Sequence, residues 1–150
     1  MAYDAAAMSE SERPLRRLLL GLLAFGLSAL LFELWALGHY EDSWQLVPLV
    51  LIPLALATVA WNAVAASAIG VRALQGAMLL VMLAGGVGIL LHYQGNAEFQ
   101  LDVNPDLAGW ALFAKVLHSK APPALAPGVM AQLGLLGLIY TFRHPALRRQ

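Results

Sequence analysis

The sequence predicts an all-α membrane protein, an antiparallel bundle of four transmembrane helices with a short amphipathic surface helix between the third and fourth spans. Of its 150 residues, 60% are hydrophobic and only 12% are charged, whereas soluble proteins carry about 25% charged residues. Four apolar stretches are each long enough to cross a bilayer core, which takes roughly 17–25 residues. The arginines lie before the first stretch, between the second and third, and after the fourth. With four membrane crossings, all these positions are on one side of the membrane.

Composition also excludes several classes of function. The chain has no cysteine, so disulfide frameworks, thiolate metal sites and iron–sulfur clusters are excluded. Its basic and acidic residues are equal in number, at 9 each, and no basic run could follow a phosphate backbone. We therefore expect no nucleic acid among its partners. The expected partners are the lipid bilayer and other membrane-protein subunits or further copies of the chain.

Residues 1–150 are predicted to form a single transmembrane domain, with residues 1–14 as a cytoplasmic N-terminal segment. The expected spans are Leu18 to Leu37, Leu46 to Ile69, Leu74 to Tyr93 and Leu125 to Phe142. The first three are joined by short turns at His39–Gln45 and Gly70–Ala73. Short turns force successive helices to run antiparallel.

The remaining connection, residues 94–123, is predicted to be a long extracytoplasmic loop. Within it, Asn104-Pro105-Asp106 is typical of a helix start and Pro122-Pro123 of a stop. Between them, apolar side chains recur at intervals of three and four residues: Leu107, Trp110, Phe113, Ala114 and Leu117. This pattern predicts a short helix on the membrane surface, with Trp110 at the depth of the lipid headgroups, capping the mouth of the bundle.

Arginine positions predict the orientation. They precede the first span, lie between the second and third, and follow the fourth: Arg13, Arg16, Arg17, Arg72, Arg143, Arg148 and Arg149. Because basic residues favour the cytoplasmic side, both termini are expected there, in a multi-pass protein of the cell's inner membrane. The opposite side is acidic, with Glu41, Asp42, Glu98, Asp102 and Asp106.

Glu33 is the one acid predicted to lie inside a span, about 22 Å along a core of roughly 30 Å. Such a carboxylate is costly in lipid unless it is protonated, paired or in contact with water, so it is a functional hypothesis by default. All the arginines lie at the far side of the membrane. Candidate partners at the level of Glu33 are His39, at the end of the first span, and His92, at the end of the third. Their convergence would require the first and third helices to be neighbours.

The candidate metal ligands form one set at the acidic side: Glu33, His39, Glu41, Asp42, His92 and Glu98. Imidazole and carboxylate groups suit divalent zinc, copper, iron or manganese. Their spacing matches no known ligand template, so the groups would have to meet through the fold.

Three other functions remain open from the sequence. His39 and His92 could be axial ligands of haem b, or Glu33 could handle protons in a small transporter or enzyme. No nucleophile elbow or phosphate-binding loop is present, and no catalytic residue is predicted. The third function, which the sequence favours, is a non-catalytic accessory or assembly subunit of a membrane complex, whose polar cluster binds helix ends together and faces a partner.

Overall fold

A computed structural model describes residues 5–120 and 122–147 of the chain, with side chains from Arg13 onward. Arg148, Arg149 and the first four residues, whose side of the membrane was predicted above, lie outside this part. The described chain contains helices and no strand: α1 Ala5–Ala36, α2 Ser43–Val64, α3 Ala68–Val103, α4 Gly109–Leu117, α5 Leu125–Thr141 and the short 3-10 helix η1 Pro145–Leu147.

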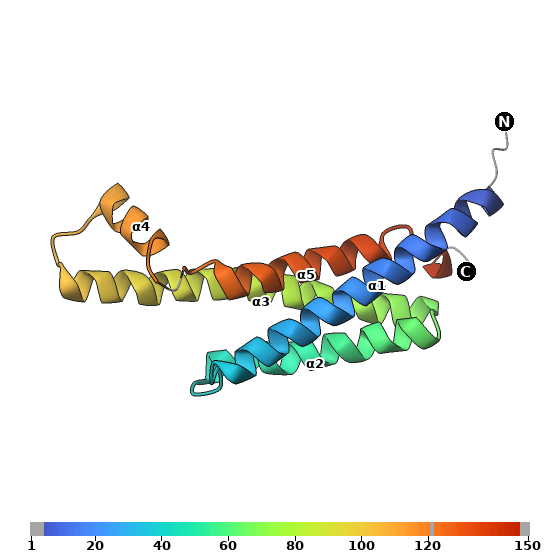
Figure 1. The fold of residues 1–150 in the computed structure, drawn as a ribbon, viewed down its shortest axis with the longest axis horizontal. Coiled ribbons are helices and arrows are strands. Elements are labelled where there is room, and N and C mark those ends of the chain that lie inside the picture. The colour runs from blue at the N-terminus through green and yellow to red at the C-terminus, as the bar shows by residue number, and fades with distance from the viewer. Residues whose placement is uncertain (1–4, 121, 148–150) are drawn as a thin grey trace.

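The four long helices pack as a ring in the order α1, α2, α3, α5 (Figure 1). Helix α1 contacts α2 and α5, and α3 contacts the same two helices. The backbones of α1 and α3 therefore lie diagonally across the bundle and do not adjoin. The condition set above for the cluster of Glu33, His39 and His92, that the first and third helices adjoin, is therefore not met, because each short turn places a helix beside its successor and the ring closes through α5.

Three helices are long and apolar enough to cross a membrane: α1 from Arg13 to Ala36, α2 and α3. Helix α5 is also apolar but shorter, at 17 residues. Large hydrophobic side chains cover the outside of the bundle, among them Phe25 at 73% exposure and Val64 at 90%. Such exposure is costly in water, whereas lipid tails solvate apolar side chains well.

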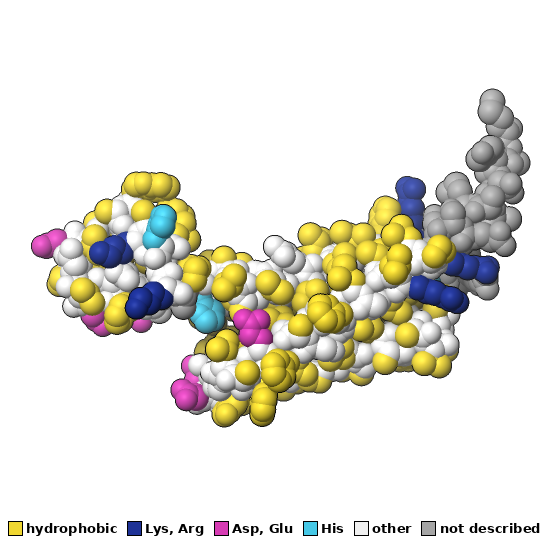
Figure 2. Space-filling view, in the orientation of Figure 1, with side chains coloured by type: hydrophobic (Ala, Val, Ile, Leu, Met, Phe, Trp, Pro, Cys, Tyr) yellow, Lys and Arg dark blue, Asp and Glu magenta, His cyan; other side chains and the backbone are white. Residues whose placement is uncertain are grey.

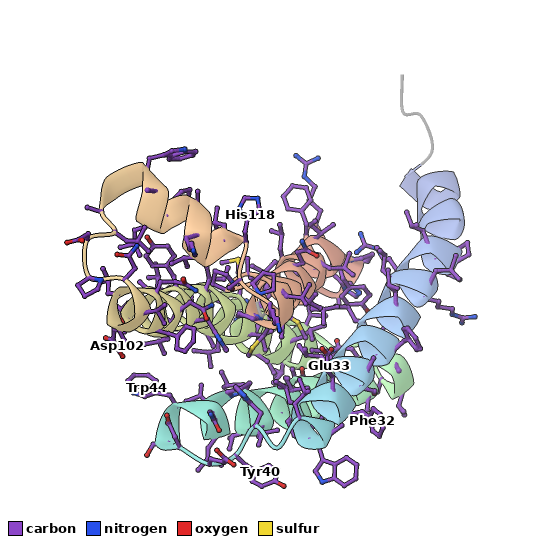
Figure 3. All side chains as sticks on the ribbon, turned by 60° about the vertical axis from the view of Figure 1, so that its left-hand side comes forward. Phe32, Glu33, Tyr40, Trp44, Asp102 and His118 are labelled. Atoms are coloured by element: carbon purple, nitrogen blue, oxygen red, sulfur yellow. The ribbon has the colours of Figure 1, made fainter. Side chains whose placement is uncertain are left out.

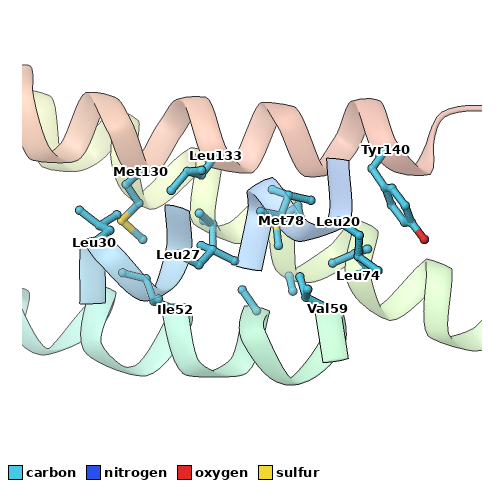
Figure 4. Packing of buried hydrophobic residues seen from close by; sticks show 14 of the residues in the cluster. Leu20, Leu27, Leu30, Ile52, Val59, Leu74, Met78, Met130, Leu133 and Tyr140 are labelled. Carbon is cyan, nitrogen blue, oxygen red and sulfur yellow. The ribbon is translucent and has the colours of Figure 1, made fainter. Parts of the chain in front are cut away.

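The core lies where all four long helices face one another (Figure 4). Its largest fully buried side chains include Leu23 and Leu27 of α1, Ile52 of α2, and Leu74 and Met78 of α3. On the α1 side these residues belong to a stripe with spacings of three and four, which places them on one face of the helix.

Helices α3 and α5 approach most closely, because glycines replace side chains at their contact. A Cβ atom on Gly85 would lie 2.5 Å from the Ala131 amide nitrogen, and one on Gly134 would lie 2.5 Å from the Met82 amide nitrogen. Small residues at such positions allow backbone contact in membranes, where apolar burial gives helices little drive to associate. Glycines of two separate helices thus create the close contact between α3 and α5.

The turn between α2 and α3 comes earlier than the sequence predicts. Helix α2 ends at Val64, and Ser67 caps α3 by accepting a hydrogen bond from the Gly70 amide at 3.1 Å. Gly70–Ala73, predicted as the turn, lies within the first two turns of α3. Hydropathy could not locate this boundary, because residues 65–69 are as apolar as the flanking helices and only the serine cap marks where α3 begins.

Helix α3 continues to Val103, ten residues beyond its predicted end at Tyr93. The glycine contacts set its antiparallel register with α5 and bring Leu125 level with Leu90 and Leu91. Residues 92–103 therefore project past the bundle by about 18 Å. The beginning of the predicted loop 94–123 is therefore helical. The sequence did not show this, because hydropathy detects where a helix leaves an apolar layer and not where the helix ends.

Helix α4 folds back against this projection (Figure 1). Asn104 does not begin α4 as predicted. It ends α3, and its Oδ1 accepts a hydrogen bond from the Asp106 amide at 3.2 Å. Val116 is fully buried, and the ring centroids of Phe113 and Tyr93 are 6.1 Å apart. Trp110, in contrast, is 78% exposed. We call residues 92–103 together with α4 the arm.

Candidate functional site

Charged side chains gather at the two ends of the bundle (Figure 2). One end, the arginine end, carries Arg13, Arg16 and Arg17 where the apolar span of α1 begins, Arg72 near the start of α3, and Arg143 just after α5. The other, the histidine end, carries the turn between α1 and α2 and the base of the arm. The surface between them is largely hydrophobic, so the molecule has the polarity of a bilayer.

His39 and His92 meet at the histidine end. Their rings are nearly parallel, at an interplanar angle of 11°, and their centroids are 6.1 Å apart. His92 lies at the point where α3 leaves the bundle. His39 lies in the turn that follows α1, and this turn brings it toward α3. The two residues therefore lie close together although α1 and α3 are diagonal in the bundle. We call them the histidine pair.

Gly38 creates the turn that positions His39. Its φ of 67° is left-handed, a conformation that glycine adopts without strain. The Gly38 amide donates to the Trp35 carbonyl at 3.1 Å and the His39 amide donates to the Leu34 carbonyl at 2.9 Å. These two bonds form a Schellman motif, which ends α1 and reverses the chain. The sequence signal for this turn is a glycine just after an apolar helix, and the left-handed φ that positions His39 is visible only in the structure.

The environment of His39 disfavours positive charge on its ring. Burial, followed by the charge of His92, lowers the pKa of His39, and Asp42 acts in the opposite direction. The neutral imidazole is therefore the favoured form of His39 near neutral pH, with an unshared ring nitrogen that can accept a proton or bind a metal.

Two of the predicted carboxylate ligands lie at the start of α2, where the local bonds are those of a helix cap. Asp42 Oδ1 accepts a hydrogen bond from the Trp44 amide at 2.6 Å, and the Glu41 amide donates to Gln45 Oε1 at 2.8 Å. These bonds satisfy amides at the N-terminal end of α2. The Asp42 side chain thus has a structural role, besides its charge near His39.

The other carboxylates are spread over separate elements. Glu33 is exposed on α1, and Glu98 is exposed on the arm, about 9 Å along α3 from His92. Figure 3 shows Asp102 near the tip of the arm, well apart from Glu33. Among the described residues, no three histidine, aspartate or glutamate side chains are grouped to hold a metal ion. The structure thus brings His39 and His92 together without grouping a third ligand beside them.

Comparisons of the chain with models of known protein families, with curated protein sequences and with solved structures find no match. The function is therefore inferred from the residues and their geometry.

Proposed function

We propose that this chain is an accessory subunit of a membrane complex and that a transmembrane helix of its partner packs on α1 beside Glu33. The observation that carries the proposal is the environment of Glu33. It is exposed within the apolar span Arg13–Ala36, and among the described residues none makes a hydrogen bond or ion pair with its carboxylate. A charged group facing lipid costs up to about 3 kcal/mol at the bilayer centre and less toward its surface.

Glu33 lies in an exposed strip on α1 that has the spacing of a helix-packing face. Its members are all exposed and follow one another at three or four residues: Leu22, Phe25, Ala29, Glu33 and Ala36. Residues at these intervals line one side of a helix. We call this set the docking strip. The core stripe of α1 points elsewhere, so the docking strip is available to another chain.

The chemistry of the strip specifies the partner. Ala29 and Ala36 allow close approach of a second backbone on either side of Glu33, as small residues do in membrane helix pairs. A lysine or arginine at the level of Glu33 would neutralise its charge, and a pair of this kind is the usual state of ionised residues inside membranes. The proposed occupant is therefore an apolar helix with one basic residue.

The orientation proposed with this function is four spans with both termini in the cytoplasm of a cell with an inner membrane. The arginine end supports the cytoplasmic assignment by the positive-inside rule. Helix α5, at 17 residues, would be the fourth span, at the short limit of about 17 residues for a bilayer. The arm and the histidine pair would then lie outside the cytoplasm.

The test is site-specific photocrosslinking in the native membrane. A photoreactive amino acid at Ala29, in the docking strip, should capture one partner whose crosslinked helix contains a lysine or arginine. The same probe at Leu54, 50% exposed on α2, is the matched control and should not capture it. The Glu33→Leu substitution should reduce the Ala29 crosslink roughly tenfold, since the partner's charge would be left unpaired.

Exchanging the charges of Glu33 and of the partner's basic residue distinguishes a specific ion pair from non-specific association. The Glu33→Lys variant should lose the partner, and replacing the partner's basic residue by glutamate should restore it. Crosslinking that is unchanged in Glu33→Leu would refute the proposal. A partner that proves to be a second copy of the chain would place the basic residue on this sequence and replace the proposal by a homo-oligomer.

A second candidate function is binding of a divalent transition metal at the histidine pair. The observation that favours it is the approach of two imidazoles from different elements. Two ligands bind such ions weakly, so water or the partner would have to complete the coordination. Titration of the purified full-length chain with zinc or copper should show one site that both His39→Gln and His92→Gln abolish. Binding that survives both substitutions would exclude the pair as the site.

A further inference from the structure

At the arginine end a cleft of about 760 Å³ opens between α1, α2 and the end of α5. Three guanidinium groups, those of Arg13, Arg16 and Arg17, line it, together with Tyr140 and His144. Among the described side chains that line it, none is acidic. We call it the arginine cleft. The charge of its described side chains is of one sign, unlike the charge at the histidine end.

The rest of the lining of the cleft is apolar. It is formed by Leu20, Gly21, Ala24, Leu56, Val59, Ala60, Ala63 and Ala66, with Asn62 as a polar member. The space exists because small residues line both helices: a Cβ on Gly21 would meet no atom within 4 Å. From Arg17 to Ala24 the cleft extends about 10 Å along α1, into the apolar span.

The three arginines have different roles. Arg16 joins α1 to the end of α5, since its Nη1 donates to the Tyr140 carbonyl at 2.7 Å. Arg13 and Arg17 are exposed, and neither makes a hydrogen bond or ion pair with another described side chain. Their donors are therefore available to a ligand, in the planar geometry that suits phosphate oxygens.

His144 adds an uncharged donor to the same cleft. Burial, followed by the charge of Arg16, lowers the pKa of His144, which favours the neutral imidazole. Its Nδ1 accepts a hydrogen bond from the Ala146 amide at 3.2 Å, so the proton of the neutral ring lies on Nε2.

We infer that the arginine cleft binds an anionic phospholipid, with its phosphate at Arg13 and Arg17 and the upper part of an acyl chain along Gly21 and Ala24. A free phosphate would use the charge but not the apolar walls, and a neutral lipid would use the walls but not the charge. Only an amphiphile with a negative headgroup uses both. Basic pockets between transmembrane helices, at the level of the headgroups, suit this class of ligand.

The experiment measures lipid binding to the purified full-length chain in detergent by native mass spectrometry. Phosphatidylglycerol should bind at one site with higher affinity than phosphatidylcholine, and inorganic phosphate should not compete at concentrations similar to that of the lipid. The double substitution Arg13→Gln with Arg17→Gln should weaken phosphatidylglycerol binding roughly tenfold or more. Arg16 is left unchanged because its loss would disturb the bundle itself.

Two matched variants make the result specific. Arg143→Gln removes one positive charge at the same end, but Arg143 lies over the Phe142 ring and does not line the cleft, so affinity should be unchanged. Gly21→Leu should weaken binding by filling the apolar wall while every arginine remains. The inference is overturned if phosphatidylcholine binds equally well, if inorganic phosphate displaces the lipid, or if the double variant behaves like Arg143→Gln.

Discussion

At the scale of single residues, the histidine end shows how one backbone conformation positions a functional group. The left-handed Gly38 ends α1 and reverses the chain, so that the next residue, His39, lies beside His92 of a helix that α1 does not adjoin. Asp42 then begins α2 and leaves a negative charge close to the histidine pair. Burial, the charge of His92 and the charge of Asp42 thus govern the protonation of His39. Each of the two charges can be removed by a single substitution.

We expect the His39 imidazole to titrate below its ordinary pKa of about 6.5, because burial and the charge of His92 both lower its pKa. The His92→Gln substitution should raise the pKa of His39, and Asp42→Asn should lower it further, since Asp42 favours the charged ring. The measurement is NMR titration of the His39 ring protons in detergent micelles. Shifts in the same direction for both variants would contradict this account.

Linkage gives the same residue an effect on stability. Because folding lowers the pKa of His39, the folded state binds fewer protons than the unfolded state, and stability falls as pH decreases below about 6.5. Above that pH, the contribution of neutral His39 to the stability of the folded state is fully present. His144, whose pKa is also lowered, acts in the same direction. His39→Gln should therefore reduce the acid-induced fall in melting temperature only in part.

At the scale of elements, the pairing of α3 with α5 depends on glycines that contact the opposite backbone. The same stretch of α3 holds two adjacent glycines with opposite surroundings. A Cβ on Gly85 would lie 2.5 Å from the Ala131 amide nitrogen, whereas a Cβ on Gly86 would meet nothing within 4 Å. Because they share helix and depth, one serves as the control for the other.

Gly85→Ala should lower the free energy of unfolding by about 1–3 kcal/mol, because the added methyl group forces two backbones apart. Gly86→Ala should leave it unchanged or raise it slightly, since alanine favours helix more than glycine does. Unfolding in mixed micelles of mild detergent and dodecyl sulfate measures both variants. Equal losses would mean that the methyl group acts on the helix itself and not on the contact between α3 and α5.

At the scale of the whole molecule, the ring of four helices, the projecting arm and the separated charges agree with the four-span placement proposed above. The arginine end holds the turn between α2 and α3, and the histidine end holds the turn between α1 and α2 and the arm. The polar part of α3 begins near Leu91, where α5 also begins in register, so both helices would leave the apolar layer together. The placement predicts which positions an external reagent can reach.

The absence of cysteine from the sequence allows this placement to be tested with single introduced cysteines. Gly95→Cys, on the arm, where a Cβ meets no atom within 4 Å, should react with a membrane-impermeant maleimide in intact cells. Ala66→Cys, exposed in the turn between α2 and α3, should react only after the cells are opened. Labelling of Ala66→Cys in intact cells would overturn the four-span orientation.

The sequence by itself determined the helical class, the apolar spans and the separation of arginine from acid. Each follows from local composition, since a backbone in lipid must satisfy its own hydrogen bonds and long apolar runs must therefore be helical. The α5 prediction, Leu125 to Phe142, differs from the observed helix by one residue, because Pro122-Pro123 and the polar residues after Phe142 bound it.

Only the tertiary structure decided which residues meet. Composition could not show that α3 continues past Tyr93, because a helix outside an apolar layer has no hydropathy signal, or that α1 lies diagonal to α3, because ring order depends on how the bundle closes. The histidine pair depends on the φ angle of Gly38, and the arginine cleft depends on small residues of separate helices facing one another. Contacts between distant segments depend on how the helices pack together, and the sequence of one segment alone does not determine that packing.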